Sequence, residues 1–171
     1  EALKRAGLKP VVLSSKEGLI LLSGTTSVTA FASLAIYDAQ TLSLTADIAG
    51  SFTLEVLKGT LMAMDERLMA VRPHPDQINT AANIRAILKD SPMLERYRGH
   101  RVQDALSIRC MPQLHGPVKK AIKDAQATLA IELNSSVDNP LIFDEEDGGA
   151  VALMGYNAAK KAYDSMHLAK Y

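Results

Sequence analysis

Four polar residues of complementary chemistry lie close together in the polar stretch from Gly99 to Gln113, namely Gln103, Asp104, Ser107 and Arg109. The stretch has poor helical periodicity and lies between two helical patterns, so we predict a loop, where functional side chains concentrate. The planar guanidinium of Arg109 can bind a carboxylate through two parallel hydrogen bonds. The alternative is a surface connector whose arginine only caps a neighbouring helix.

The other candidates for chemistry are isolated in the sequence. The hydroxyl-rich segment 23–26 precedes a long helical pattern and could face an anion there, although an ordinary helix cap is the simpler interpretation. The four histidines, His74, His100, His115 and His167, share no metal-ligand spacing with a cysteine or carboxylate, so we predict no metal site and structural or solvated histidines. Cys110 has no activating histidine nearby in sequence, which favours a buried, inert thiol.

Composition limits the class of protein. The chain has 171 residues, 47% of them hydrophobic and 22% charged, which is enough for one globular core. Nineteen basic and 19 acidic residues leave no basic excess, so we expect no nucleic-acid partner. The longest apolar run, 150–154, is too short to span a bilayer, and one cysteine fits a reducing compartment, so we expect a cytoplasmic protein. Because the first residue is Glu1 and not Met, we expect a fragment or a processed product.

The first half of the chain predicts short helices around one long one. A first helix, 1–6, ends at Gly7, and a capping box of Ser14 and Glu17 begins a second over 16–22. A long helix follows over 25–49, broken at Gly50 and continued by another from Ser51 to Leu57. The residues expected on the buried side of the long helix are Val28, Phe31, Ala35, Leu42 and Ile48.

The second half also predicts helices. Short and longer helices are expected over 65–71 and 76–89, separated by an extended segment, 72–75, that its prolines enforce. The apolar side expected for 76–89 is formed by Ile78, Ala82, Ile84, Ile87 and Leu88. The clearest helix is 115–134, and Lys119 lies away from its apolar seam, which consists of Val118, Ile122, Ala125, Leu129 and Leu133.

After these helices we expect an extended segment over 141–143, a turn over 144–149 and a last helix over 158–169. The chain therefore predicts an all-α helical bundle, with residues 1–171 forming a single helical domain that is part of a larger one. The apolar seams are more numerous than a small monomer could cover, so we expect an oligomer, or a missing half of the same domain.

Three segments together resemble the aromatic amino-acid ammonia-lyase family. Residues 16–25, K-E-G-L-I-L-L-S-G-T, are similar to the family's K-E-G-L-A-L-[LI]-N-G-T. Residues 103–113, Q-D-A-L-S-I-R-C-M-P-Q, are similar to Q-D-P-Y-S-L-R-C-x-P-Q, and residues 136–141 contain the S-x-D-N-P-L turn. Three independent motifs in the expected order make the resemblance specific over 1–143.

This resemblance implies both a reaction and roles for three residues. The family eliminates ammonia and a β-proton from an aromatic amino acid to give an arylacrylate, and histidine is the substrate we expect. The resemblance makes Gln103 the catalytic glutamine, and Arg109 and Ser23 substrate-binding residues, with Arg109 holding the carboxylate. It also implies a homotetramer whose active site is shared between subunits, a fold of the ammonia-lyase/fumarase type, and a methylidene-imidazolone group cyclised from an Ala-Ser-Gly tripeptide.

The sequence departs from the family pattern at the chemistry. It contains no Ala-Ser-Gly, which the family carries upstream of the first motif, so the prosthetic group is expected only if that tripeptide precedes Glu1. Ser23 replaces an asparagine, and Leu106 replaces the tyrosine of the family's Q-D-x-Y-S-L-R loop; a leucine can neither transfer a proton nor donate a hydrogen bond. Two hypotheses follow. The chain is a fragment or divergent member of the lyase family, inactive alone, or a non-catalytic scaffold or amino-acid-binding relative.

Overall fold

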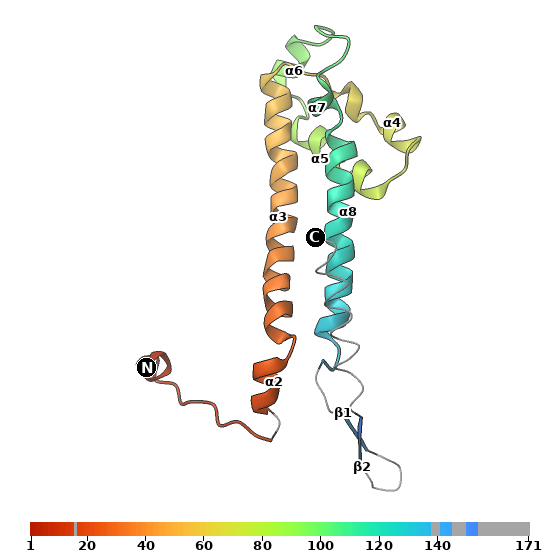
Figure 1. Cartoon of the computed structure of the whole chain (residues 1–171). Helices are drawn as coiled ribbons and strands as arrows, with labels where there is room; N and C mark the ends of the chain where they lie inside the picture. The colour runs from red at the N-terminus through yellow and green to blue at the C-terminus, as the bar shows by residue number, and fades with distance from the viewer. Residues whose placement is uncertain (16, 138–140, 145–149, 154–171) are drawn as a thin grey trace. The chain divides into compact units, whose positions relative to one another are not determined.

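The computed structural model describes residues 1–15, 17–137, 141–144 and 150–153. The chain divides into two compact units, one formed by 1–31 with 131–171, and the other by 32–130. We call these unit 1 and unit 2. The helices, in chain order, are α1 (Ala2–Arg5), α2 (Glu17–Ser23), α3 (Thr26–Val56), the 3-10 helix η1 (Leu61–Met64), α4 (Glu66–Ala70), α5 (Pro75–Ile87), α6 (Pro92–Arg96), α7 (Leu106–Arg109) and α8 (Met111–Leu133) (Figure 1).

Unit 1 confirms the predicted helix starts and stops. Helix α1 ends at Arg5 with Ala6 as its C-cap, and Gly7 then takes the left-handed conformation, with a φ of +69°. At the start of α2 the backbone N–H of Ser14 donates to Oε2 of Glu17 over 2.6 Å, which is one half of the predicted capping box.

A short β-hairpin interrupts the helical pattern in unit 1. Strand β1 (Leu141–Asp144) pairs antiparallel with β2 (Ala150–Leu153), so that Leu141 lies opposite Leu153. The predicted extended segment at 141–143 is thus confirmed, whereas its partner strand was not predicted. The predicted turn falls mostly on 145–149, which, like the predicted helix over 158–169, lies outside the described residues.

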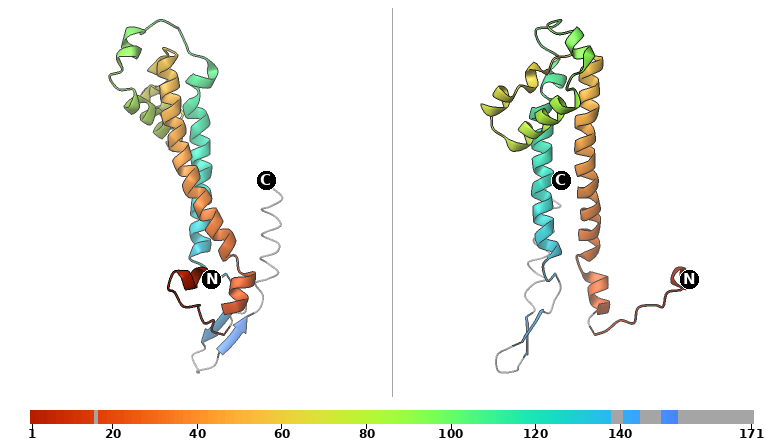
Figure 2. Two further views of the ribbon diagram at one scale, coloured as in Figure 1. Left: turned by 90° about the vertical axis from the view of Figure 1, so that its left-hand side faces the viewer. Right: turned by 180° about the vertical axis from the view of Figure 1, so that it is seen from behind.

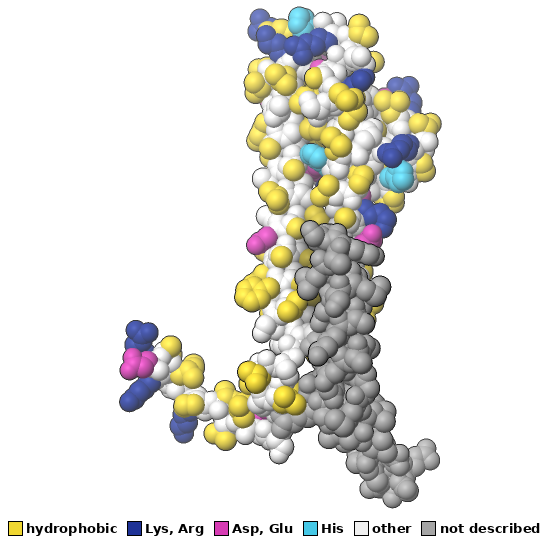
Figure 3. All heavy atoms as spheres, in the orientation of Figure 1, with side chains coloured by type: hydrophobic (Ala, Val, Ile, Leu, Met, Phe, Trp, Pro, Cys, Tyr) yellow, Lys and Arg dark blue, Asp and Glu magenta, His cyan; other side chains and the backbone are white. Residues whose placement is uncertain are grey.

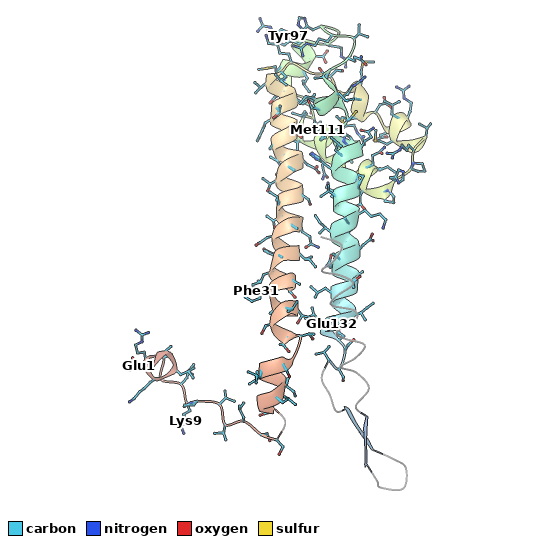
Figure 4. All side chains as sticks on the ribbon, in the orientation of Figure 1. Glu1, Lys9, Phe31, Tyr97, Met111 and Glu132 are labelled. Carbon is cyan, nitrogen blue, oxygen red and sulfur yellow. The ribbon has the colours of Figure 1, made fainter. Side chains whose placement is uncertain are left out.

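Helix α3 corrects the prediction of a break at Gly50, because the helix continues without interruption to Val56. The glycine at this position makes room for a neighbouring side chain and does not end the helix. A Cβ atom on Gly50 would lie 2.4 Å from the Sδ atom of Met111 on α8, far inside van der Waals contact. Because Gly50 has no side chain, the first residue of α8, Met111, can lie close to α3 (Figure 4).

Unit 2 is built on α3 and α8, which run side by side with α5 packed against them (Figures 1 and 2). Its apolar core gathers around the C-terminal part of α3 and consists of Leu54, Met64, Met69, Ala81, Ile84, Leu88 and Met111. The partly buried residues Leu61, Ala63, Leu94 and Ile108 pack against this core. Three of the methionines are therefore core residues, as the sequence suggested.

The inward faces of the helices differ from their predicted apolar faces. Of the side predicted for α5, Ile84 and Leu88 are buried, but Ile78 is exposed and polar Gln77 and Thr80 are buried. On α3 the buried residues are Asp47, Ser51 and Leu54 instead of the predicted stripe. Asp47 can occupy an inward position because Asn83 on α5 and Lys119 on α8 donate hydrogen bonds to it, as described below. The residues of that predicted stripe are exposed in the part of the chain that the structure describes.

Helix α8 starts earlier than predicted and turns a different side inward. It begins at Met111, so the predicted loop over 99–113 contains α7 and the first turn of α8. Gly116 and Lys119 are buried, whereas Val118 of the predicted seam is exposed. The reason is a close approach to α5, since a Cβ atom on Gly116 would lie 2.8 Å from the backbone nitrogen of Gln77.

Among the described helices, no single one is long and apolar enough to cross a membrane. Helices α2 and α3 reach that length and composition only as a pair, which is bent by 52° at the break between them.

Candidate functional site

The structure brings Gln103 and Arg109 together in unit 2. Nη1 of Arg109 donates a hydrogen bond to Oε1 of Gln103 across the short helix α7. This helix begins after Ala105 and places Arg109 in its last turn. Leu106 and Ser107 occupy the exposed side of the same turn. A glutamine and an arginine at a spacing of six residues therefore form one polar pair.

The segment carrying this pair is held by its flanking residues. Asp104 is buried, and its Oδ2 accepts a hydrogen bond of 2.8 Å from the backbone N–H of Thr60. Ile108 packs against the core, and Met111 and Pro112 are buried immediately after α7. The pair thus lies on backbone that is fixed from both sides.

The guanidinium of Arg109 has a hydrogen-bond donor without an acceptor within the described part of the chain. Its Nε atom is buried without a hydrogen-bond partner, and so is Oε1 of Gln113 one turn later. Buried polar atoms are normally satisfied, so these two mark a place where the hydrogen bonding of this chain alone is incomplete. Arginine presents five N–H groups in a planar fork, which suits it to a carboxylate ligand.

Of the three predicted site residues, Ser23 lies in unit 1, whereas Gln103 and Arg109 lie in unit 2. It is the last residue of α2, and its hydroxyl donates to the backbone oxygen of Leu19 over 3.0 Å. In the same hydroxyl-rich segment, Thr25 donates to Oε1 of Glu132 over 3.2 Å. The structure therefore pairs Gln103 with Arg109 and describes Ser23 within a different unit.

A buried polar cluster in unit 2 was missed by the sequence reasoning. Asp47 of α3 is completely buried and lies 2.9 Å from Nδ1 of His115, and it also accepts from Lys119 and from Nδ2 of Asn83 at 2.8 Å. Burial opposes ionisation of Asp47, but hydrogen bonds from Lys119, Asn83 and His115 outweigh it and lower its pKa below the usual value. The signal was present, because α3 carries three acidic residues and no basic one, which points to a partner on another helix.

A polar groove adjoins this cluster between α3, α5 and α8. Its charged residues are Asp76, Lys119 and Lys123, and Lys123 forms an ion pair with Asp76. Gln40 donates to Gln126 over 2.6 Å across the same groove. Since Asp47 and Asp76 balance the two lysines, the groove carries no net charge that would select an anion. In the part of the chain that the structure describes, no three His, Cys, Asp or Glu side chains gather as metal ligands would.

Comparison with known proteins identifies the family to which the chain belongs. A family model described as aromatic amino acid lyase matches residues 1–168. A histidine ammonia-lyase from Sorangium cellulosum is 49% identical over 159 residues, which cover 91% of this chain and 31% of that protein. The solved structure of histidine ammonia-lyase from Trypanosoma cruzi matches with a TM-score of 0.73 and 35% identity, over 91% of this chain and 28% of the other.

A third relative is named as an aminomutase instead of a lyase. It is tyrosine aminomutase from Streptomyces globisporus, with a TM-score of 0.76 and 31% identity, over 91% of this chain and 33% of that one. This chain spans roughly a third of the length of the relatives that it matches. The match over 1–168 and the all-α architecture confirm the resemblance that the three motifs carried, and the chain belongs to the aromatic amino acid lyase family.

Proposed function

We propose that this chain is part of a protein that removes ammonia from an aromatic amino acid, with histidine as the substrate. The observation that carries the proposal is the Gln103–Arg109 pair, in which an arginine with unsatisfied hydrogen-bonding capacity lies beside an amide. Histidine is favoured because histidine ammonia-lyases match this chain with 45–49% identity over most of its length.

Arg109 holds the substrate carboxylate and so sets the position of the α- and β-carbons. Gln103 offers its amide to the substrate or to the group that attacks it, and the hydrogen bond to Arg109 orients that amide. Ser23 offers a hydroxyl where the family has an asparagine. Its shorter side chain reaches less far toward the substrate than an asparagine would. The reaction releases ammonia and a β-proton and leaves an arylacrylate.

The methylidene-imidazolone group that the family implies does not fit the residues of this chain, because none of the 171 residues form an Ala-Ser-Gly tripeptide. Such a group would supply an electrophile that makes the amine a better leaving group. Leu106 also offers no proton-transfer atom at the position of the family's tyrosine. We therefore propose that this chain alone binds the substrate without converting it.

The competing function is that of a non-catalytic relative that keeps the helical scaffold for assembly or amino-acid binding. Leu106 and Ser23, which replace a tyrosine and an asparagine, favour this alternative. Retention of both Gln103 and Arg109 favours the lyase. Arylacrylate formed from histidine by the complete protein that carries this segment would decide for the lyase, and binding without turnover would decide for the scaffold.

The remaining expectations stay part of this proposal. We propose a cytoplasmic homo-oligomer, a tetramer by family, in which residues 1–171 form part of one larger helical domain. Support comes from the family model, which matches the chain without interruption over 1–168, and from the large apolar side chains that α3 exposes.

The binding step can be tested on the 171-residue chain by titration with L-histidine and with histamine, which lacks the carboxylate. We expect histidine to bind more tightly than histamine, and Arg109→Ala to abolish that preference. Arg101→Ala is the matched control, since it removes an exposed arginine from the same segment. Equal affinity for the two ligands in the unmodified chain would contradict the proposed carboxylate site.

A further inference from the structure

The end of α3 leaves one backbone group to be satisfied from elsewhere in the chain. After the last helical residue, Val56, Lys58 adopts the left-handed conformation with a φ of +56°. The N–H of Gly59 then returns to the oxygen of Leu54 over 2.9 Å, which closes the helix in the manner of a Schellman motif. The next N–H, that of Thr60, points away from the helix and needs an acceptor.

Asp104 supplies that acceptor from 44 residues further along the chain. Its Oδ2 lies 2.8 Å from the nitrogen of Thr60, and the residue is only 6% exposed. Gly59 makes room for this contact, because a Cβ atom there would lie 2.9 Å from Oδ2 of Asp104 and 2.4 Å from Cδ1 of Leu54. A charged acceptor on a backbone N–H is stronger than a neutral one, so the contact is a firm anchor.

The anchor lies at the start of the segment that carries the Gln103–Arg109 pair. Gln103 precedes Asp104 directly, and α7 begins two residues after it at Leu106. The far end of the segment is held by Met111, which packs where Gly50 leaves space on α3. Both ends of 103–111 are therefore attached to α3 or its exit, one by a hydrogen bond and the other by packing.

We propose that Asp104 is a positioning residue for the carboxylate-binding pair. By fixing the backbone at residue 104 against Thr60, it sets the separation of Gln103 and Arg109 and the direction of the guanidinium. Asp104 touches neither substrate nor reacting atoms in this assignment. The inference rests on the proposed function for its ligand, but the contact that it invokes can be tested without any ligand.

The ligand test compares three variants of the 171-residue chain. Asp104→Ala removes the acceptor, and Asp104→Asn keeps a carbonyl oxygen that can accept from Thr60. Asp124→Ala removes an exposed carboxylate that pairs with Lys120 on its own helix. We expect Asp104→Ala to lower the preference for histidine over histamine about fivefold, the worth of one net hydrogen bond. Asp104→Asn and Asp124→Ala should stay within about twofold of the unmodified chain. Equal weakening of both ligands by Asp104→Ala would mean a general structural role and would overturn the proposal.

Amide hydrogen exchange of the same variants decides the question even if the chain binds no histidine. In Asp104→Ala we expect faster exchange at Thr60 and also across α7, from Leu106 to Arg109, with unchanged circular dichroism. Faster exchange at Thr60 alone would show that Asp104 only caps the exit of α3, and the proposal would fail. A chain without histidine preference but with faster exchange across α7 would refute the proposed function and leave the positioning contact intact. If Asp104→Ala does not fold, Gly59→Ala perturbs the anchor from the other side and should give the same exchange pattern.

Discussion

Nδ1 of His115 on α8 lies 2.9 Å from Oδ1 of Asp47 on α3, in a cluster that Lys119 and Asn83 complete. One buried carboxylate thus receives hydrogen bonds from α5 and α8 and joins three helices of unit 2. Because a buried charge is costly unless it is paired, the cluster specifies one alignment of these helices more than it adds stability. Removing a single partner should be more damaging than removing the whole group.

The first prediction concerns Asp47 and Lys119. Asp47→Ala should lower the free energy of unfolding by about 3–5 kcal/mol, because Lys119 is left buried without its counter-charge. Replacing both residues, with Asp47→Leu and Lys119→Met, should cost less than Asp47→Ala alone. Urea denaturation of both variants and of the exposed control Asp124→Ala measures this. A double variant less stable than Asp47→Ala would contradict the argument.

The second prediction is acid sensitivity. The pKa of Asp47 lies below its usual value of 3.8, since burial is outweighed by hydrogen bonds from Lys119, Asn83 and His115. The unfolded chain therefore binds a proton at higher pH than the native chain does, so stability is present above pH 3.8 and is lost as the pH falls through the native pKa.

Urea midpoints at a series of acid pH values measure this loss, and Asp47→Asn should make the dependence shallower. Asp65 is a second acid-sensitive group, because the side chain of Arg67 lowers its pKa to about 2. Its contribution should remain in Asp47→Asn. An unchanged pH dependence in that variant would show that Asp47 does not contribute.

Local signals in the sequence predicted some of the helix boundaries. The Glu17 half of the capping box forms at the start of α2, and α4 begins directly after Asp65, within one residue of the predicted start. The prolines around His74 lie in the predicted extended segment, but α5 begins at Pro75 and so includes its last residue. The motif carrying Gln103 and Arg109 likewise identified two residues that the structure brings into contact.

Packing between helices could not be predicted from the sequence of any one helix. Gly50 was interpreted as a helix break, but it makes room for Met111, which is 61 residues away. Lys119 was placed away from the apolar seam by its spacing on the helix, whereas it is buried against its counter-charge, Asp47, on another helix. Such positions depend on partners that periodicity cannot identify.

The third prediction tests the close approach of α8 to α5. Gly116→Ala should destabilise the chain by about 1–3 kcal/mol, because its Cβ would meet the backbone of Gln77, which cannot rotate away. Gly18→Ala in α2 is the control, since its Cβ would lie 3.8 Å from Leu13 and alanine favours a helix. Thermal unfolding of both variants should show opposite changes, and equal stabilisation would exclude the clash.

The fourth prediction concerns the family tyrosine that Leu106 replaces. Leu106→Tyr restores the family's tyrosine at a position where the leucine is 64% exposed, so folding should be unaffected. The variant chain should still form no arylacrylate from histidine, because no Ala-Ser-Gly is present to make the electrophile. Ultraviolet absorbance after long incubation measures the product, with Arg109→Ala in the same background as a control. Product that appears with Leu106→Tyr and vanishes with Arg109→Ala would show that the chain needs no such electrophile.

The fifth prediction is self-association through the apolar side of α3. Val28, Phe31 and Leu42 are spaced by three and eleven residues, which brings them to one side of the helix, and all three are exposed. Figure 4 shows Phe31 standing out from α3, and Figure 3 shows hydrophobic side chains at several levels of the visible face. Exposed apolar groups in such a row are typical of a surface that another protein covers.

Light scattering at micromolar concentration should therefore give a mass above that of one chain. The double replacement Phe31→Ser and Leu42→Ser should shift the mass toward the monomer, because it removes two large apolar side chains without touching the core of unit 2. Val102→Ser is the matched control, since Val102 is 97% exposed but lies outside the helices. A monomeric unmodified chain with cooperative unfolding would refute the association. If Val102→Ser lowered the measured mass equally, the contact between chains would not lie on α3.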